Sequence, residues 1–504
     1  MKFPNLFTNF FPSAKAFVGG LRYRPVMAFF VLVFLIVAYC VVMPFIQPAV
    51  FTMFRYLPLV LSLLVSGFLG YVYFRKIGSR GGFINAMVLT FLLALPGWMA
   101  IANFADVMQE WSIALTLEPR ALTKPPYSTD RRSLNKATAS IYAQNSNHES
   151  LLTSGHPHIA ADMSDSEHPR MWWQVPFYYR EGLNYYLGSV AKIVRIDADS
   201  PNMAVDLKAG EKAEFYFGEE STYVHALFAL RLPFSRPSHA QYYRHADGTW
   251  SLLIPAISYR PTITGAMIPE YTKVMQVLPN GNYHVHSAAD AGKLFPGAPL
   301  FPLELGRLYS ASYGKFKSGL INYYDTVLGR NNIFEISEDD VAAGHVLDES
   351  QNATDNRFPF YQTFLGEGLK QMVPLEPVGP SFALSEILLF DAGTGEASSY
   401  IPAVEDSLNA PRKAERQVWT ALPTFPQDKY KAVEARFKMS KSGKYFWLFT
   451  VVNTSADKSI YAKLVLVDAK DLVPMAFDNQ NQVDQFLEGA IAAPQNVPAA
   501  APVP

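Results

Sequence analysis

Three long apolar runs near the start of the chain are the most regular feature of its hydrophobic pattern. They occupy Val26–Ile46, Tyr56–Phe74 and Phe83–Phe104, and none of them contains a charged residue or a histidine. A helix needs about 20 apolar residues to cross the roughly 30 Å hydrocarbon core of a bilayer. The pattern therefore predicts a three-helix transmembrane block at residues 26–104, after an N-terminal arm at residues 1–25.

Lysine and arginine residues in the short flanking segments predict how this block is oriented. The first loop holds only Arg55, whereas the arm and the second loop hold Lys2, Lys15, Arg22, Arg24, Arg75, Lys76 and Arg80. Short loops rich in these residues stay in the cytoplasm, so we expect a cytoplasmic N-terminus and an extracytoplasmic, periplasmic C-terminal region. The predicted localisation is the cell (inner) membrane, as a multi-pass protein in contact with the lipid bilayer.

The pattern changes twice after the apolar block. Residues 105–170 begin as a mixed helical face and then become polar, which predicts a juxtamembrane helix and a linker. From residue 171 onward, short runs of aromatic and β-branched residues alternate with Gly, Pro and Asp-Gly, which is typical of strands. A helical insert is expected at 303–328. The length predicts two extracytoplasmic α+β domains, 171–330 and 331–489, and the Pro/Ala-rich tail at 490–504 is expected to be disordered.

Four stretches of the C-terminal region share one pattern, an aromatic-rich strand followed by a gap and an apolar strand. They are residues 172–200, 248–281, 369–400 and 444–472. The second strand reaches Pro279-Asn280-Gly281 in one stretch and an Asp in the other three, namely Asp197, Asp391 and Asp468. Asp and Asn tolerate the backbone angles of tight turns, so the pattern predicts repeated strand–turn units.

The segment at residues 386–401 (EILLFDAGTGEASSYI) places Asp391, Thr394 and Gly395 between two strands. It resembles the strand–Asp-x-x-Thr-Gly-Glu–strand hairpin of PepSY-type domains, which are small extracytoplasmic α+β modules associated with peptidase inhibition or with envelope assemblies. The other stretches match loosely, and residues 467–471 lack the Thr-Gly pair. PepSY-class proteins that carry electrons are expected to hold haem through histidines in their spans, and the apolar runs here contain none.

Together these elements predict a membrane-anchored α+β fold: three N-terminal transmembrane helices, then a large extracytoplasmic region of antiparallel sheet units with helical inserts. The net charge of −1 and the 17% of charged residues give no sign of a nucleic-acid partner. The single cysteine, Cys40, lies in the first apolar run, so disulfides and cysteine metal sites are excluded after residue 104. No phosphate-binding or dinucleotide-binding glycine motif is present, and no cofactor is expected.

The densest group of polar residues lies between residues 148 and 168. His156 and His158 are separated by one proline, and Asp165 and His168 are one helical turn apart. Imidazole and carboxylate groups in this number are able to bind zinc or another divalent metal, which makes these four the candidate ligands. The segment lacks an HExxH motif, and the alternative interpretation is a solvated linker.

Two further clusters have both a chemical and a structural interpretation. Residues 239–247 contain His, Tyr, Arg and Asp side chains suited to acid–base chemistry, but they end in Asp-Gly, which favours a loop before a strand. His284 and His286 share one face of an expected strand, where two ligands alone do not make a metal site.

These observations favour a non-enzymatic function. The leading hypothesis is a membrane-anchored extracytoplasmic binding or scaffold protein that regulates an envelope or membrane protein partner. One alternative is a metal-dependent envelope hydrolase with its site in the His/Asp-rich segment or at 239–247, and another is an accessory subunit of a transport or secretion complex. The partner and the oligomeric state are left open.

Overall fold

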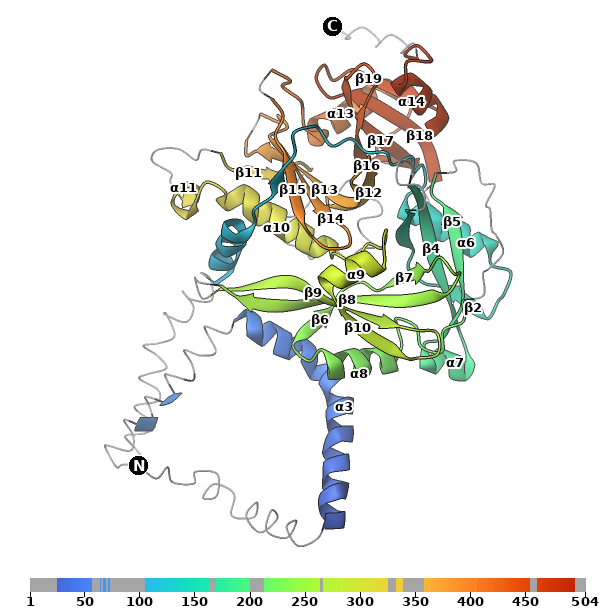
Figure 1. Ribbon diagram of the computed structural model, residues 1–504. Coiled ribbons are helices and arrows are strands. Elements are labelled where there is room, and N and C mark those ends of the chain that lie inside the picture. The colour runs from blue at the N-terminus through green and yellow to red at the C-terminus, as the bar shows by residue number, and fades with distance from the viewer. Residues whose placement is uncertain are drawn as a thin grey trace.

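The computed structural model describes most of the chain from residue 105 onward and one long helix before it. The described residues are 25–56, 64, 67–68, 71–72, 105–163, 169–199, 213–262, 266–324, 332–338, 358–379, 381–403, 405–453 and 460–494. Four sheets make up the larger part of this structure, with a few helices packed on them (Figure 1).

Each sheet is formed by strands that are neighbours in the sequence. The first contains β2 (Leu152–Ser154), β3 (His158–Asp162), β4 (Arg170–Tyr179) and β5 (Val190–Asp197). The second contains β6 (Ser235–Pro237), β7 (Gln241–Arg244), β8 (Trp250–Pro261), β9 (Met267–Val277) and β10 (Tyr283–Ser287). The third contains β11 (Phe334–Ile336), β12 (Phe360–Phe364), β13 (Gly368–Pro377), β14 (Glu386–Asp391), β15 (Ala397–Tyr400) and the parallel strand β1 (Arg120–Ala121). The fourth contains β16 (Tyr430–Met439), β17 (Tyr445–Asn453), β18 (Ile460–Asp468) and β19 (Pro474–Phe477).

The four sheets share one arrangement of strands. A long central strand pairs with a second long strand in each, as β4 with β5, β8 with β9, β13 with β14 and β17 with β18. On its other side the central strand of three sheets meets an interrupted partner: β2 and β3, β6 and β7, or β11 and β12. In the fourth sheet this partner is β16, which carries a bulge between Val433 and Arg436. The four long pairs coincide with the four stretches that share the sequence pattern, so the predicted strands are confirmed.

A residue at the end of each second long strand, or shortly after it, also caps the following turn. The side-chain oxygen of each one accepts backbone N–H groups at 2.8–3.0 Å; the four residues are Asp197, Asn280, Asp391 and Asp468. This is the local hydrogen bonding for which Asp and Asn are favoured in turns. In the turn of the PepSY-like segment, Gly395 has a φ of 78°, and a Cβ there would lie 2.5 Å from the ring of Phe301. Only glycine fits that position.

A helix precedes the strands of each sheet: α6 (Lys136–Ser146), α8 (Thr222–Arg231), α10 (Leu303–Phe316) and α13 (Pro411–Ala421). The shorter helices are α7 (Gly182–Leu187), α9 (Ala288–Leu294), α11 (Leu320–Tyr324) and α14 (Gln480–Leu487). The α10 and α11 helices occupy the predicted helical insert. The Asn135 side chain caps α6 by accepting the Thr138 N–H at 2.9 Å, and α13 begins with a proline, which suits the first turn of a helix.

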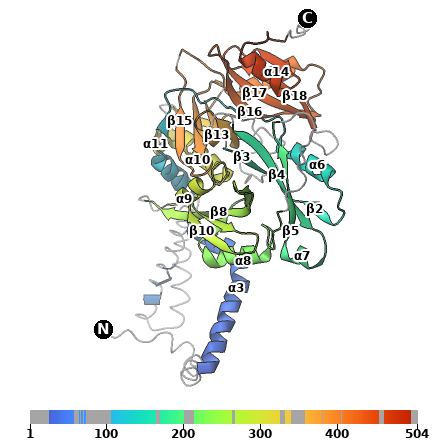
Figure 2. The ribbon, with the colours of Figure 1, turned by 45° about the vertical axis from the view of Figure 1, so that its right-hand side comes forward.

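The sheets are packed together around shared cores. In Figures 1 and 2 the second sheet lies nearest the N-terminal helix, the fourth lies at the opposite end, and the first and third lie between them. The largest core cluster joins the second, third and fourth sheets, through residues such as Val274, Leu388 and Trp447, all fully buried. This core includes residues on both sides of the expected domain boundary at residue 330, and the boundary itself stays a prediction.

The predicted transmembrane block is contradicted by the structure. Within the described ranges, no helix combines the length and the apolar character needed to cross a membrane. The first predicted span lies in α3 (Pro25–Arg55), whose N-terminal half projects from the sheets with apolar side chains exposed, while its C-terminal part packs on α8 and β6 (Figure 1). Met43, Gln47 and Phe51 are only 6–7% exposed, and Gln47 Nε2 donates to the carbonyl of Leu232 at 3.0 Å. Part of the apolar run therefore packs within the molecule.

The other predictions that depended on the transmembrane block are corrected as well. The third predicted span lies outside the described residues, and only a few positions of the second, at 56–74, lie within them. The multi-pass inner-membrane localisation with an extracytoplasmic C-terminal region is contradicted as well, because it depended on the three spans. The predicted membrane-anchored α+β fold class is likewise wrong, since the described chain is a sheet-rich structure with a few helices.

The segment expected to be a polar linker is more structured than its composition indicates. Residues 105–116 are helical as predicted, but α6, β2 and β3 follow before residue 163. Between the 105–116 helix and α6, the segment at 128–135 has buried polar residues: Asp130, Arg132 and Asn135 are each at most 2% exposed. Tertiary packing has overridden the polar composition, because the side chains of Thr129 and Arg132 find partners in the third and fourth sheets.

Candidate functional site

The interruptions in the four sheets meet around one cavity. Residues of the cavity wall lie at or beside each interruption: His158 opens β3, Gln241 opens β7, Phe360 opens β12, and Glu434 lies in the bulge of β16. Glu434 has a φ of 59°, a conformation that non-glycine residues rarely adopt. The regular strand pairing is interrupted at these four points, and the cavity lies beside them.

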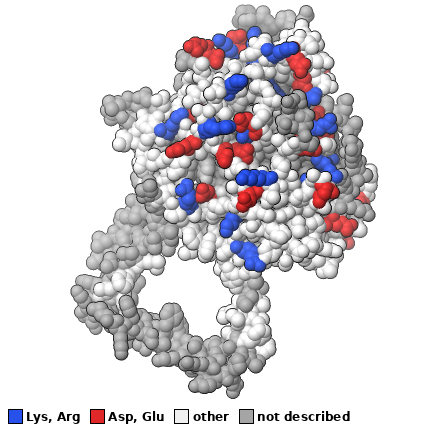
Figure 3. Space-filling model, viewed as in Figure 1, with Lys and Arg blue, Asp and Glu red and all other residues white. Residues whose placement is uncertain are grey.

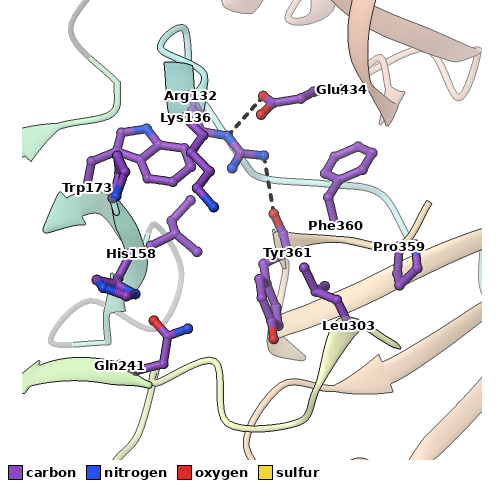
Figure 4. Close-up of a pocket in the computed structure, with 12 residues that line it drawn as sticks. Arg132, Lys136, His158, Trp173, Gln241, Leu303, Pro359, Phe360, Tyr361 and Glu434 are labelled. Carbon is purple, nitrogen blue, oxygen red and sulfur yellow. Dashed lines mark hydrogen bonds and ion pairs between the residues drawn. The ribbon is translucent and has the colours of Figure 1, made fainter. Parts of the chain in front are cut away.

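The cavity has a volume of about 70 Å³ (Figure 4). Figure 4 shows His158, Gln241 and Trp173 on one side and Glu434, Phe360 and Tyr361 on the other, with Arg132 reaching toward both Glu434 and Tyr361. The lining also includes Lys136 and Leu303, which are the first residues of α6 and α10. A polar cavity of this size has room for several water molecules.

One side of the cavity, which we call the histidine wall, consists of His158, Gln241, Glu219, Tyr178 and Tyr242. His158 is 4% exposed, and neither of its ring nitrogens has a hydrogen-bond partner. Its Nε2 lies 3.7 Å from Oε2 of Glu219, within ion-pair range but beyond a hydrogen bond. Gln241 is 5% exposed, and its Oε1 likewise has no partner. Buried atoms without partners also occur elsewhere in the described chain, as at Gln362, but those of His158 and Gln241 belong to residues that line the cavity.

Behind His158, two tyrosines hold Glu219. The Tyr178 hydroxyl donates to Glu219 Oε1 at 2.9 Å and lies 3.1 Å from the Tyr242 hydroxyl, which accepts the Glu219 N–H at 3.2 Å. Burial would raise the pKa of Glu219, but His158 and the hydrogen bond from Tyr178 outweigh it and lower this pKa. Burial, with the Glu219 carboxylate nearby, raises the pKa of both phenols well above 10, and Tyr242 adds to the rise for Tyr178. Glu219 is therefore a carboxylate and the two tyrosines keep their protons.

The opposite side, the charged wall, consists of Asp130, Arg132, Glu434, Arg436 and Lys438. Arg132 Nη2 lies 3.2 Å from Asp130 Oδ2, and its Nε lies 3.4 Å from Glu434 Oε2. Arg132 also donates to the Tyr361 carbonyl at 3.2 Å. Burial would lower the pKa of Arg132, but the nearby carboxylates outweigh it and raise this pKa. Its charge is thus compensated on two sides.

The remaining members of the charged wall bind the backbone of the 128–135 segment. Arg436 donates to the Arg132 carbonyl and, at 2.6 Å, to the Thr450 hydroxyl. Lys438 Nζ donates to the Ser128 carbonyl at 2.9 Å and to that of Asp130. Burial, with Arg436 close by, lowers the pKa of the Lys438 amine to about 8.

The same segment connects three sheets through its backbone. The N–H groups of Ser128, Thr129 and Ser133 donate at 2.7–2.9 Å to carbonyls in β16, in β12 and just after β5. Asp199, beside the last of these contacts, has a carboxylate oxygen without a hydrogen-bond partner. Burial, with Asp130 and Asp197 nearby, raises the pKa of Asp199 to about 7.

Aromatic side chains line the cavity and are held in place. Trp173 Nε1 donates to the Leu134 carbonyl at 2.8 Å, and the Tyr361 hydroxyl donates to the Phe301 carbonyl at 2.7 Å. The Arg132 guanidinium carbon lies 5.8 Å from the ring centre of Trp173 and 5.9 Å from that of Phe360. The cavity therefore combines fixed apolar faces with a few polar groups, as small-molecule sites do.

The predicted metal ligands are only partly within the described structure. His158 is in the histidine wall and His156 is exposed, while Asp165 and His168 lie outside the described residues. Both histidines are close enough to Glu219 to lower its pKa. Among the described residues, no group of three His, Cys, Asp or Glu side chains is arranged to hold a metal ion. The four-residue metal site stays a prediction.

The other sequence candidates have separate places in the structure. Tyr242, from the 239–247 cluster, belongs to the histidine wall, and its ring lies 5.7 Å from that of His158. His245 instead lies 2.7 Å from the Ser251 hydroxyl, and His286 lies 3.0 Å from Gln276 Oε1. Tyr178 and Tyr242 each belong to a Tyr-Tyr pair in the sequence. Arg132 and Glu219 were not singled out, because nothing in the sequence distinguishes them from surface charges.

Comparisons with known proteins add little to this geometry. No family model and no curated protein matches the sequence. One solved structure, that of the polysaccharide lyase Uly1, aligns at 12% identity with a TM-score of 0.16, covering 64% of this chain and 60% of the lyase chain. A likeness this weak supports no conclusion about fold or activity, and the resemblance of residues 386–401 to PepSY-type domains stays a prediction.

Proposed function

We propose that this protein is a non-enzymatic binding protein that holds a small ligand in the cavity between its sheets. The observation that carries the proposal is His158, a buried side chain at the cavity wall whose two ring nitrogens lack hydrogen-bond partners. An unsatisfied buried polar group costs about 1–3 kcal/mol, so its presence is explained if a ligand supplies the missing hydrogen bond.

The chemistry of the wall supports binding rather than catalysis. The raised pKa values of Tyr178 and Tyr242 and the lowered pKa of Glu219 keep these groups in their usual protonation states near neutral pH. A catalytic acid or base works best when its pKa lies near the operating pH. The residues that line the cavity also include no serine, threonine or cysteine as a nucleophile.

A protein partner, expected from the sequence, stays a separate prediction. On the face shown in Figure 3, acidic and basic side chains are interspersed. Such a surface gives little long-range attraction for a strongly charged macromolecule, whereas a single-sign patch would. The cavity is therefore the feature on which the proposal rests.

The test is a ligand-observed NMR screen of the full chain against a mixed library of small neutral, anionic and cationic compounds. Leu303→Phe, which adds a ring at the cavity from the start of α10, is expected to abolish the binding of any hit. Leu294→Phe is the matched control, because Leu294 is exposed on α9 and does not line the cavity. The proposal is wrong if no compound binds the wild-type chain, or if hits bind Leu303→Phe equally well.

A further inference from the structure

We infer that the ligand of this cavity is a small, neutral, hydroxyl-rich compound, a polyol about the size of glycerol. The inference rests on the proposed binding function and adds the chemical class of the ligand. Three features carry it: the hydrogen-bonding groups that lack partners, the charges that already have them, and the size and apolar faces of the cavity.

Four residues that line the cavity have atoms without hydrogen-bond partners. Arg132 Nε and Glu434 Oε2 face each other at 3.4 Å, so the atoms left for a ligand are those of His158 and Gln241. His158 Nε2 faces Glu219, so a proton on Nε2 would lie toward the carboxylate and leave Nδ1 as an acceptor. Gln241 Oε1 is a second acceptor without a donor. A hydroxyl group donates to such acceptors and also accepts, so a compound with two or more hydroxyls satisfies both.

The charges of the cavity disfavour ionic ligands. Arg132 and Lys136 line it together with one carboxylate, Glu434, and Asp130 lies 3.2 Å from Arg132, so these charges balance and give a cation no net attraction. An anion gains little from Arg132, because Asp130 and Glu434 already compensate this guanidinium at 3.2 Å and 3.4 Å. Lys136 also interacts elsewhere within the chain. A neutral ligand needs no compensating charge from the cavity.

Size and shape restrict the class further. A volume of about 70 Å³ corresponds to roughly five to seven positions of about 10–15 Å³ each, the space that one bound water needs. A glycerol-sized molecule occupies a similar number of positions with its carbon and oxygen atoms. Its C–H groups would pack on Trp173, Phe360 and Tyr361, while its hydroxyls would reach His158 and Gln241.

The experiment is an NMR titration of the full chain with three small probes that differ in charge: glycerol, acetate and ethylammonium. Glycerol is expected to bind saturably and more tightly than either ion. Gln241→Leu and His158→Phe each remove one acceptor at nearly constant volume, and each is expected to weaken glycerol binding about tenfold. Using two variants keeps the test decisive if one of them folds poorly.

Gln362→Leu is the matched control. Gln362 is fully buried on β12 and both of its amide atoms lack partners, yet it does not line the cavity, so its loss should leave glycerol binding unchanged. Tighter binding of acetate or ethylammonium would overturn the polyol class while leaving the proposed binding function intact. Glycerol binding that survives both acceptor variants, or no binding of any probe, would also overturn it, and the library screen then decides the binding function separately.

Discussion

The charged wall and the histidine wall face each other across one cavity, and they differ in how their buried charges are compensated. In the charged wall, Arg132 lies between two carboxylates, and Arg436 and Lys438 donate to carbonyls of the 128–135 segment. Four atoms of this wall make no hydrogen bond, namely Asp130 Oδ2, Arg132 Nε, Glu434 Oε2 and Arg436 Nε, but three of them belong to the ion pairs of Arg132. In the histidine wall, the Glu219–tyrosine group behind the surface is satisfied, but His158 and Gln241 at the surface leave atoms without partners.

The difference distinguishes residues that stabilise the fold from residues that are available to bind a ligand. Removing one partner from a satisfied buried network leaves the other groups uncompensated, so such a network contributes strongly to a single native arrangement. Groups that lack partners in the folded chain contribute little to its stability and are free to hydrogen-bond something else. Substitutions in the charged wall should therefore mainly lower stability. Substitutions of His158 or Gln241 should mainly weaken ligand binding.

The largest effect is expected in the charged wall, for Asp130→Ala. Asp130 is fully buried, accepts the Arg132 N–H at 2.8 Å and pairs with its guanidinium. Its loss leaves a buried arginine with a single carboxylate partner, and we expect the free energy of unfolding to fall by about 3–5 kcal/mol. Urea unfolding with an unchanged denaturant slope measures this directly.

Arg120→Ala provides the control for that measurement. Arg120 forms an ion pair with Glu367 at 3.2 Å, but its side chain is 68% exposed. Exposed pairs of this kind are worth less than about 1 kcal/mol, because solvent screens the charges. If Asp130→Ala cost no more than Arg120→Ala, the charged wall would not have the structural role assigned to it.

The strand pairs were predictable from the sequence, whereas the way they meet was not. The long strands of the four sheets stand out as aromatic and β-branched runs, and Asp197, Asp391 and Asp468 mark the turns after them. The transmembrane prediction failed because hydropathy alone does not reveal that the C-terminal part of α3, mostly after the first apolar run, packs on α8 and β6.

The candidate site was predictable only in fragments. His158 and Tyr242 each belonged to a cluster chosen for its chemistry, but the clusters are about 80 residues apart and were considered separately. Arg132 and Glu434 look like ordinary surface charges in the sequence, and they become buried only because the 128–135 segment crosses the bulge of β16. A contact between segments so distant in sequence leaves no local signal in a single chain.

An intermediate effect is expected for Asp199→Asn, and it should depend on pH. The pKa of Asp199 is raised from 3.8 to about 7, so between about pH 4 and pH 7 the native state binds this proton more tightly than the unfolded chain does. Wild-type stability therefore falls as pH rises through that window, and above it the ionised carboxylate destabilises the native state. Asparagine cannot ionise, so the variant should be more stable than wild type by on the order of 2 kcal/mol at pH 8 and about equal at pH 4.

Parallel urea titrations of both proteins at several pH values check this prediction. The acidic end of the series is its own control, because both side chains are neutral there. A gain of the same size at every pH would mean that the substitution acts through packing or hydrogen bonding instead. A loss of stability at pH 8 would mean that the Asp199 carboxylate is a satisfied member of the charged wall.

The smallest loss of stability is expected for His158→Phe, in the histidine wall. Phenylalanine keeps a ring of similar shape and removes two nitrogens that have no hydrogen-bond partners, so we expect the free energy of unfolding to stay the same or to rise by about 1–3 kcal/mol. Urea unfolding of both proteins measures this change. Tyr242→Phe is the matched control on the same wall: its hydroxyl has two partners, and losing it should cost about 1–3 kcal/mol. If His158→Phe were the more costly of the two, His158 would be bound into the fold, and the contrast between the two walls would no longer hold.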